Sequence, residues 1–122
     1  MSTNIYTNAK AILRGLTTIY TAPSAGTSIV KSIRVTNNDE VNDREITLSV
    51  TDTSSVEYVI ELNRTIQKKS SQEILASGNL DQTSADSSVS SPAPIILKSS
   101  EVLKATTTGS DIHLVASILE MT

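Results

Sequence analysis

The stretch TSIVKSIRVTNND, residues 27–39, alternates apolar and polar side chains and then ends in residues that favour turns. Ile29, Ile33 and Val35 recur with the two-residue period of a β-strand, and Lys31 interrupts them. The other face of the strand is expected to carry Val30, Ser32, Arg34 and Thr36. The Asn-Asn-Asp that follows favours a chain reversal, because these side chains hydrogen-bond nearby backbone groups. The stretch therefore predicts a half-buried strand and a turn.

Similar alternation recurs along the chain. Longer strands are expected at 46–50, 56–62 and 112–119. Shorter candidates lie at 11–13, 17–22, 71–76, 94–97 and 101–107. Turn-forming residues occupy the joints at 23–26, 37–39, 52–55, 68–71, 98–100 and 108–111. In the run from 112 to 119 both faces carry apolar residues, which is typical of a central strand covered on both sides.

The spacing of these strands predicts the fold class. Short strands separated by turns, without the 3.6-residue apolar stripe of a long helix, indicate an all-β protein. We expect an antiparallel β-sandwich of eight or nine strands in two sheets. A jelly-roll-like strand order is favoured, and an immunoglobulin-like order remains open.

Length and composition limit the class of protein. With 122 residues the chain fits a single domain, residues 1–122, and a modest core that must be aliphatic, because Phe and Trp are absent. The net charge of -3 disfavours nucleic acid and anionic membrane surfaces as partners. Cysteine is absent, so disulfides and thiolate sites are excluded. We find neither a secretory signal pattern nor an apolar run of membrane-spanning length.

Two segments depart from the rhythm of strands. The segment SGNLDQTSADSSVSSPAP, residues 77–94, contains few large apolar residues and is expected to be a long polar loop. Residues 1–8 are expected to form a short N-terminal arm. An extended arm can add a strand to a neighbour's sheet edge through backbone hydrogen bonds. The predicted partner-binding residues are therefore the apolar side chains of these two segments, Ile5, Tyr6, Leu80 and Val89.

Side chains that could perform chemistry are sparse. The single imidazole, His113, lies within an apolar strand and is interpreted as structural or as a surface residue. The acidic stretch 37–46 offers oxygen ligands but lacks the spacing of a calcium loop. Lys68 and Lys69 are too few for a phosphate-binding stripe, and the acceptor triplet at Asn63 is interpreted as chance. We expect no catalytic residue, no metal and no cofactor.

The order of the segments resembles a family of small structural proteins encoded by tailed phages and prophages. The likeness is carried by YTNAKAILRGLTTIYTAP, TSIVKSIRVTN, ITLSVTD and IILKSSEVLKATTTGSDIHLVASILEM. Two features depart from the family pattern. Ser100 and Glu101 replace a Gly-Asp turn, and the loop at 77–94 is longer. The resemblance implies a protein of the virion, synthesised in the host cytoplasm.

Three functions follow as hypotheses. The leading one is a non-enzymatic capsid decoration or cement protein that binds the major capsid protein or other virion proteins. A neck, tail or fibre-attachment protein of the phage particle is the alternative within the same class, and a carbohydrate-binding or receptor-binding β-sandwich module is the alternative from a different class. Because a small aliphatic core leaves little stability, we also expect a homo-oligomer, a trimer first.

Overall fold

The computed structural model describes residues 4–75, 94–109 and 112–121. Within these ranges the chain contains nine strands and no helix. The strands are β1 (Asn4–Leu13), β2 (Thr17–Thr21), β3 (Thr27–Asn37), β4 (Arg44–Thr51), β5 (Glu57–Ile66), β6 (Ser70–Glu73), β7 (Ile95–Leu97), β8 (Val102–Thr107) and β9 (Ile112–Met121). None of the described residues forms a helix that is long and apolar enough to cross a membrane.

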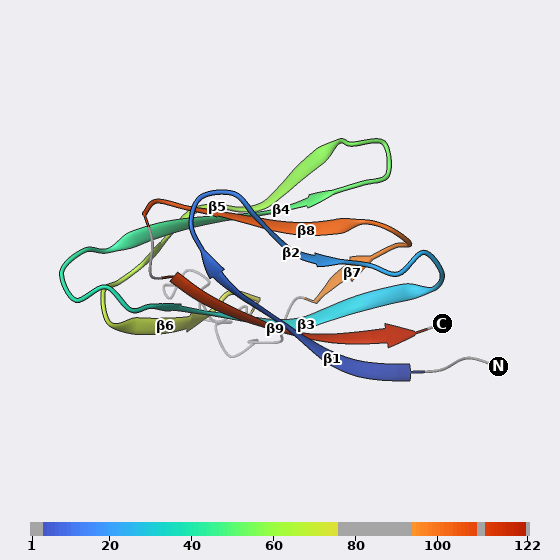
Figure 1. Cartoon of the computed structure of the whole chain (residues 1–122), viewed down its shortest axis with the longest axis horizontal. Coiled ribbons are helices and arrows are strands. Elements are labelled where there is room, and N and C mark those ends of the chain that lie inside the picture. The colour runs from blue at the N-terminus through green and yellow to red at the C-terminus, as the bar shows by residue number, and fades with distance from the viewer. Residues whose placement is uncertain (1–3, 76–93, 110–111, 122) are drawn as a thin grey trace, which may run out of the picture.

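The strands form two antiparallel sheets that pack face to face as a sandwich (Figure 1). One sheet has the order β1-β9-β3-β6, with β7 also paired to β3, and the other has the order β2-β8-β4-β5. The all-β sandwich predicted from the strand pattern is confirmed. The central position expected for residues 112–119 is also confirmed, because β9 pairs with both β1 and β3.

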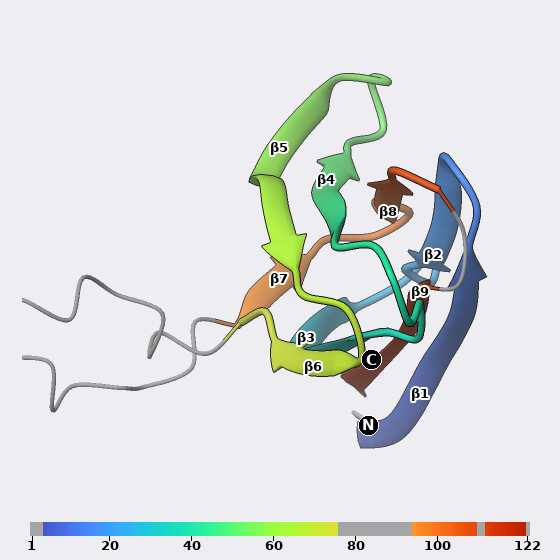
Figure 2. The same ribbon diagram turned by 90° about the vertical axis from the view of Figure 1, so that its left-hand side faces the viewer.

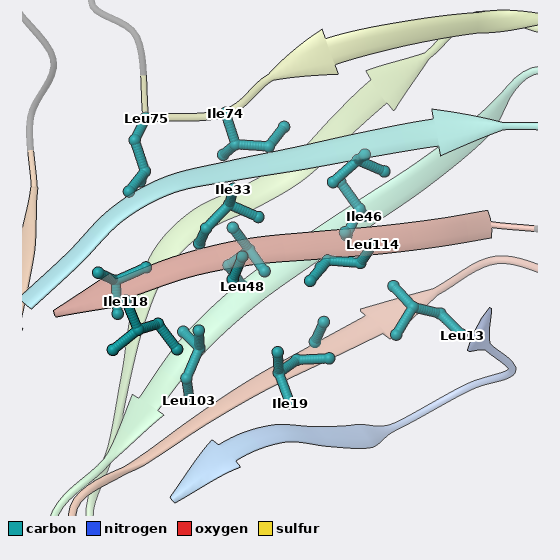
Figure 3. Packing of buried hydrophobic residues seen from close by; sticks show 14 of the residues in the cluster. Leu13, Ile19, Ile33, Ile46, Leu48, Ile74, Leu75, Leu103, Leu114 and Ile118 are labelled. Atoms are coloured by element: carbon teal, nitrogen blue, oxygen red, sulfur yellow. The ribbon is translucent and has the colours of Figure 1, made fainter. Parts of the chain in front are cut away.

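The core lies between the two sheets and is aliphatic (Figure 3). Its largest fully buried side chains are Leu13, Ile33, Ile46, Leu48, Ile66, Leu97, Leu103, Ile112, Leu114, Ile118, Val30 and Val35. Strands β3, β4, β8 and β9 each contribute two or more buried residues. Strands β1 and β7 each end on a fully buried leucine, Leu13 and Leu97. Burial of each such side chain contributes roughly 1.5 to 3 kcal/mol before chain entropy is subtracted.

The assignment of residues to the two faces of β3 needs a correction. Relative to β9, the register of β3 shifts between Val30 and Ser32, which leaves Lys31 as the extra residue of a β-bulge. Val30 and Ile33 are both fully buried, although two residues rather than one separate them. Ile29, predicted to share the face of Ile33, instead lies on the opposite, outer face. The interruption of the apolar pattern at Lys31 was the sequence's sign of this bulge.

The second correction concerns β5, which was predicted as a half-buried strand. Its apolar residues Tyr58, Val59, Ile60 and Leu62 are exposed on both faces, and only Ile66 is fully buried. The strand is the outermost of its sheet, and its register against β4 shifts twice. Figure 2 shows β5 and β1 at opposite sides of the sandwich. The alternation along β5 therefore does not correspond to one covered face.

The predicted N-terminal arm and polar loop have different outcomes. Residues 4–8, assigned to the arm, belong to β1 and pair in register with residues 117–121 of β9. Pairing with β9 satisfies the backbone groups on one side of this segment, which a free arm would leave to solvent. All but the last residue of the loop at 77–94 lies outside the described residues.

The turn before β8, formed by residues 98–101, is closed by hydrogen bonds. The Glu101 backbone N–H donates to the Lys98 carbonyl at 3.1 Å. The Glu101 carboxylate in turn accepts the Lys98 N–H at 2.8 Å. Ser100 takes a φ of 66°, the left-handed value that the third position of a type II turn requires. The serine accommodates a conformation that glycine usually provides.

Polar side-chain contacts also link the two sheets at two places. Tyr20 of β2 donates its hydroxyl proton to the Glu120 carboxylate of β9 and lies 3.0 Å from the Ser28 hydroxyl of β3. On the side of β5 and β6, Arg64 Nε donates to Gln72 Oε1 at 2.9 Å, and Nη1 donates to the Ile74 carbonyl at 3.3 Å. Each set of contacts links a strand of one sheet to the other sheet.

Candidate assembly surface

A row of apolar side chains crosses the outer face of the five-stranded sheet. Tyr6 of β1 lies opposite Leu119 of β9, Leu119 lies opposite Ile29 of β3, and Ile29 lies opposite Ile96 of β7. Residues directly opposite each other in antiparallel strands point to the same face, so the four form one continuous row. We call this row the apolar ladder. Ile29 belongs to it only because the bulge at Lys31 turns it outward.

The two ends of the apolar ladder are open to solvent. Tyr6 is 75% exposed and Ile96 is 61% exposed, whereas Leu119 and Ile29 between them are half-buried. Scattered exposed apolar residues are common on protein surfaces, but contiguous groups usually mark an interaction site. The continuous row across four strands is therefore the candidate interaction surface on this face.

The remaining outer face of the same sheet is mixed in character. Lys10, Val115 and Arg34 form the row nearer the opposite end of β9, and Ile12 lies opposite His113 in the next. A shallow hollow of about 320 Å³ lies between β1 and β9 beside these rows. Its lining residues are Lys10, Ala11, Ile12, His113, Leu114 and Val115. His113 is thus exposed on a sheet surface, where it was interpreted as a structural or surface residue.

A second hollow of about 420 Å³ lies at the loop between β3 and β4. Asp39 organises this loop, because its carboxylate accepts the backbone N–H groups of Val41 and Asn42 at 2.8 and 3.0 Å. The Arg44 guanidinium contacts the other carboxylate oxygen at 2.7 Å. The two backbone donors first, and then Arg44, hold the pKa of Asp39 well below its usual range.

Asn37 anchors the same loop to the sandwich. Its side-chain NH2 donates to the carbonyls of Asn42 and Ile66, each at 3.0 Å, and its Oδ1 accepts the Asp39 N–H at 2.9 Å. Asn37 is fully buried, so these bonds satisfy a polar group that would otherwise destabilise the fold. The acidic stretch is therefore a hydrogen-bonded turn, and in the described ranges no three His, Asp or Glu side chains gather in a way that could hold a metal ion.

The residues predicted to bind a partner have separate locations. Ile5 and Tyr6 are adjacent in β1 and point to opposite faces, since Ile5 lies opposite Glu120 and Tyr6 lies opposite Leu119. Ile5 is 50% exposed at the sheet margin. Leu80 and Val89 lie outside the described residues. The structure thus brings Tyr6, but not Ile5, into the apolar ladder.

Sequence reasoning missed the other three members of the ladder. Ile29, Ile96 and Leu119 each belong to a strand that was predicted, but their grouping depends on strand pairing and on the bulge in β3. The sequence alone could indicate only that single residues of these strands point outward. Leu119 faces away from the buried residues of its strand, and PIIL at 94–97 carries two isoleucines in succession, so one of them must point outward.

Comparison with known proteins does not assign the chain to a family. No protein-family model matches it, and no curated protein matches its sequence. Among solved structures, a Bacillus endospore appendage protein, described as forming disulfide-linked pili, matches with a TM-score of 0.48 and 9% identity. That match covers 98% of this chain and 87% of the pilus protein.

Viral capsid structures also match. The capsid structure of the Helicobacter pylori bacteriophage KHP30 matches with a TM-score of 0.44 and 16% identity, covering 100% of this chain and 94% of that one. The VP2 subviral particle of infectious bursal disease virus matches with a TM-score of 0.47 and 8% identity. The chain spans only 32% of VP2. At these scores and identities the matches assign no function.

Proposed function

We propose that the protein is a non-enzymatic structural subunit of a bacteriophage virion, in which it decorates or cements the capsid. The observation that carries this proposal is the apolar ladder on the outer face of the five-stranded sheet. An exposed apolar row on a rigid sheet can bind a flat protein surface without any change in the sheet itself. The resemblance of the segments at 6–23 and 95–121 to a tailed-phage family supplies the virion context.

The chemistry of the surface agrees with binding rather than catalysis. Tyr6 and Ile96 provide apolar contact area, and Lys10 and Arg34 provide charges two rows away on the same face, beyond the row of Asn8, Ser117 and Ser32. Interfaces between proteins combine an apolar centre with a polar rim in this way. The ladder is therefore proposed as the centre of the contact with the major capsid protein or another virion protein, and the two cations as part of its rim.

The strand order supports a jelly-roll interpretation of the sandwich. Along the chain, β1, β2, β3 and β4 alternate between the two sheets, and β8 and β9 insert between β2 and β4 and between β1 and β3. Jelly rolls are double sheets of this kind, and capsid proteins are among the classes that use them. Because the same architecture serves unrelated functions, it supports the proposal only weakly beside the ladder.

The place in the particle and the oligomer remain parts of the proposal. We propose a homo-oligomer, with the trimer as the first candidate, because symmetric assembly would add stability to a small aliphatic core. Copy number separates capsid decoration from a neck or tail location. On the order of hundreds of copies per virion are expected for a capsid protein, and about a dozen or fewer for a neck or tail protein.

Replacing Ile96 by Asp tests the role of the ladder. A serine at this position would still leave the apolar contacts of the neighbouring ladder residues in place. Ile96→Asp instead places a charge in the proposed interface. We therefore expect Ile96→Asp to reduce the amount of bound protein at least roughly tenfold. The measurement is the number of copies on purified phage particles, by quantitative mass spectrometry, after addition of the variant to particles that lack the protein.

The matched control is Leu62→Asp, since Leu62 is 68% exposed on β5, away from the ladder. We expect this variant to bind as the unmodified protein does. Far-ultraviolet circular dichroism and denaturant unfolding confirm that both variants are folded. Equal binding of Ile96→Asp and Leu62→Asp, or no detectable binding of the unmodified protein to particles, would contradict the proposal.

A further inference from the structure

The free edge of β1 differs from the other sheet margins. β1 pairs with β9 through ten consecutive residues without a register shift, and its other side has no partner among the described strands. It contains no proline, and its one charged side chain is Lys10. A long, regular and open edge of this kind is a template for another strand, because a row of backbone N–H and C=O groups is left unpaired.

The other outer strands carry features that oppose pairing. β5 has two register shifts, and β2 has five residues and one shift. β6 has four residues and β7 has three. Bulges and short lengths are the usual means by which proteins protect sheet edges. Among the described strands, only β1 combines full length with regular geometry at an open edge.

We propose that β1 pairs antiparallel with β1 of a second copy of this chain, about a two-fold axis at Ala9. In this register the residue numbers of any two opposite residues, one from each copy, add up to 18. Tyr6 then lies opposite Ile12 of the second copy, and Asn8 lies opposite Lys10. On the inner face Ala9 meets itself and Thr7 meets Ala11. The two five-stranded sheets join into one continuous sheet across the axis.

The side chains of β1 favour this register over its neighbours. Shifting the axis to Lys10 would place the two Lys10 ammonium groups directly opposite each other, which is unfavourable. Shifting it to Asn8 would place Tyr6 opposite Lys10 and Ile12 opposite Asn4. Only with the axis at Ala9 do the exposed Tyr6 and Ile12, at 75% and 58%, cover each other twice. The strand is therefore self-complementary in charge and in apolar surface.

The proposed pairing of two β1 strands would form between isolated chains and does not depend on a place in a virion. A two-fold contact also does not close a trimer, so a trimer would need a contact elsewhere. Tyr6 of β1 belongs both to the apolar ladder and to this edge. Ile96, the residue that is changed to test the ladder, lies on β7 and away from the edge of β1. Failure of one proposal can therefore be told from failure of the other.

Single-cysteine variants test the axis, because the chain has no cysteine of its own. In Ala9→Cys the two new thiols of a dimer are directly opposite, with Cβ atoms about 4.5 to 5.5 Å apart, close to the span of a disulfide. In the matched control Ala11→Cys they are four residues from alignment, or about 13 Å apart. Both alanines are half-buried on the same face of β1.

We expect mild oxidation with diamide to cross-link most of the Ala9→Cys protein into a dimer on a non-reducing gel, at least tenfold faster than the control. Equal rates of cross-linking, or faster cross-linking of Ala11→Cys, would overturn the proposal. Pairing of β1 with a different strand, or with another protein, would produce that result.

A charge series on Asn8 tests the register independently. Asn8→Glu places a carboxylate opposite Lys10 of the second copy twice per dimer, so the dissociation constant should fall by roughly 2- to 30-fold at low salt. Asn8→Lys places like charges there and should raise it similarly. Asn8 is exposed on the outer face, so neither change disturbs the core. Sedimentation equilibrium gives the constants, and weaker association of Asn8→Glu would exclude this register.

Discussion

β1 and β5 are the outermost long strands of their sheets, and each has ten residues. Each also ends on a fully buried residue, Leu13 in β1 and Ile66 in β5. They differ in regularity, because β1 keeps one register against β9 while β5 shifts twice against β4. An edge strand can thus be left as a usable template or be made irregular, within one small sandwich.

The irregularity of β5 has a local cause. Asn63 adopts a φ of 50°, in the left-handed region, and its Oδ1 and backbone N–H are both bonded to the Thr47 hydroxyl. Asparagine tolerates this conformation better than most residues. The bonds to Thr47 hold β5 to β4 where regular pairing is lost. The exposed apolar residues of β5 therefore accompany an edge that resists further strand addition.

The largest expected difference between β1 and β5 is in the free energy of unfolding lost when a leucine of each strand is replaced by alanine. Leu13→Ala removes a fully buried side chain, so we expect a loss of about 2 to 5 kcal/mol in the free energy of unfolding. Leu62→Ala removes a side chain that is 68% exposed and should change the same quantity by less than about 0.5 kcal/mol. Urea unfolding followed by circular dichroism measures both. Comparable losses would show that β5 is covered in solution.

The next effect sharpens the comparison at the side of β5. Arg64→Met keeps an apolar stem but removes the bonds to Gln72 and to the Ile74 carbonyl, so we expect a loss of about 1 to 3 kcal/mol. Arg34→Met, on the exposed outer face of β3, is the control and should cost less than about 0.5 kcal/mol. An equally small effect of Arg64→Met would mean that its bonds do not hold β5 to β6.

The smallest effect belongs to the contacts of β2 with β9 and β3, where Tyr20→Phe should cost about 0.5 to 1.5 kcal/mol at neutral pH. Burial, followed by the hydrogen bond to Glu120, raises the pKa of Tyr20 from 10.0 to about 12. The folded state therefore keeps a proton that the unfolded state loses above pH 10. Stability should fall between pH 10 and 12, and it should fall less in Tyr20→Phe.

Unfolding free energies of both proteins at several pH values across this window provide the test. The other titrating groups are common to the two proteins, so the difference between the curves isolates Tyr20. Parallel curves for the unmodified protein and Tyr20→Phe would contradict the assigned pKa. If Tyr20→Phe loses less unfolding free energy at neutral pH than Arg64→Met, the contacts of Arg64 hold the two sheets together more strongly than those of Tyr20.

Much of the fold could be predicted from local patterns. The strands at 27–37 and 112–121 were recognisable by their alternation, and the joints by their turn-forming residues. The candidate surface was harder. Tyr6 was named because it is apolar in a polar segment, but its partners in the apolar ladder come from three other strands. Their grouping depends on pairing between segments distant in the chain.

The sequence by itself determined the class of fold, since period-two alternation with an aliphatic composition can bury its apolar faces only between sheets. Tertiary structure alone decided which of two similar edges stays regular, and on which face Ile29 lies. One extra residue at Lys31 reverses the facing of every residue on one side of it. Such a shift depends on pairing with β9, and pairing is a property of two segments together.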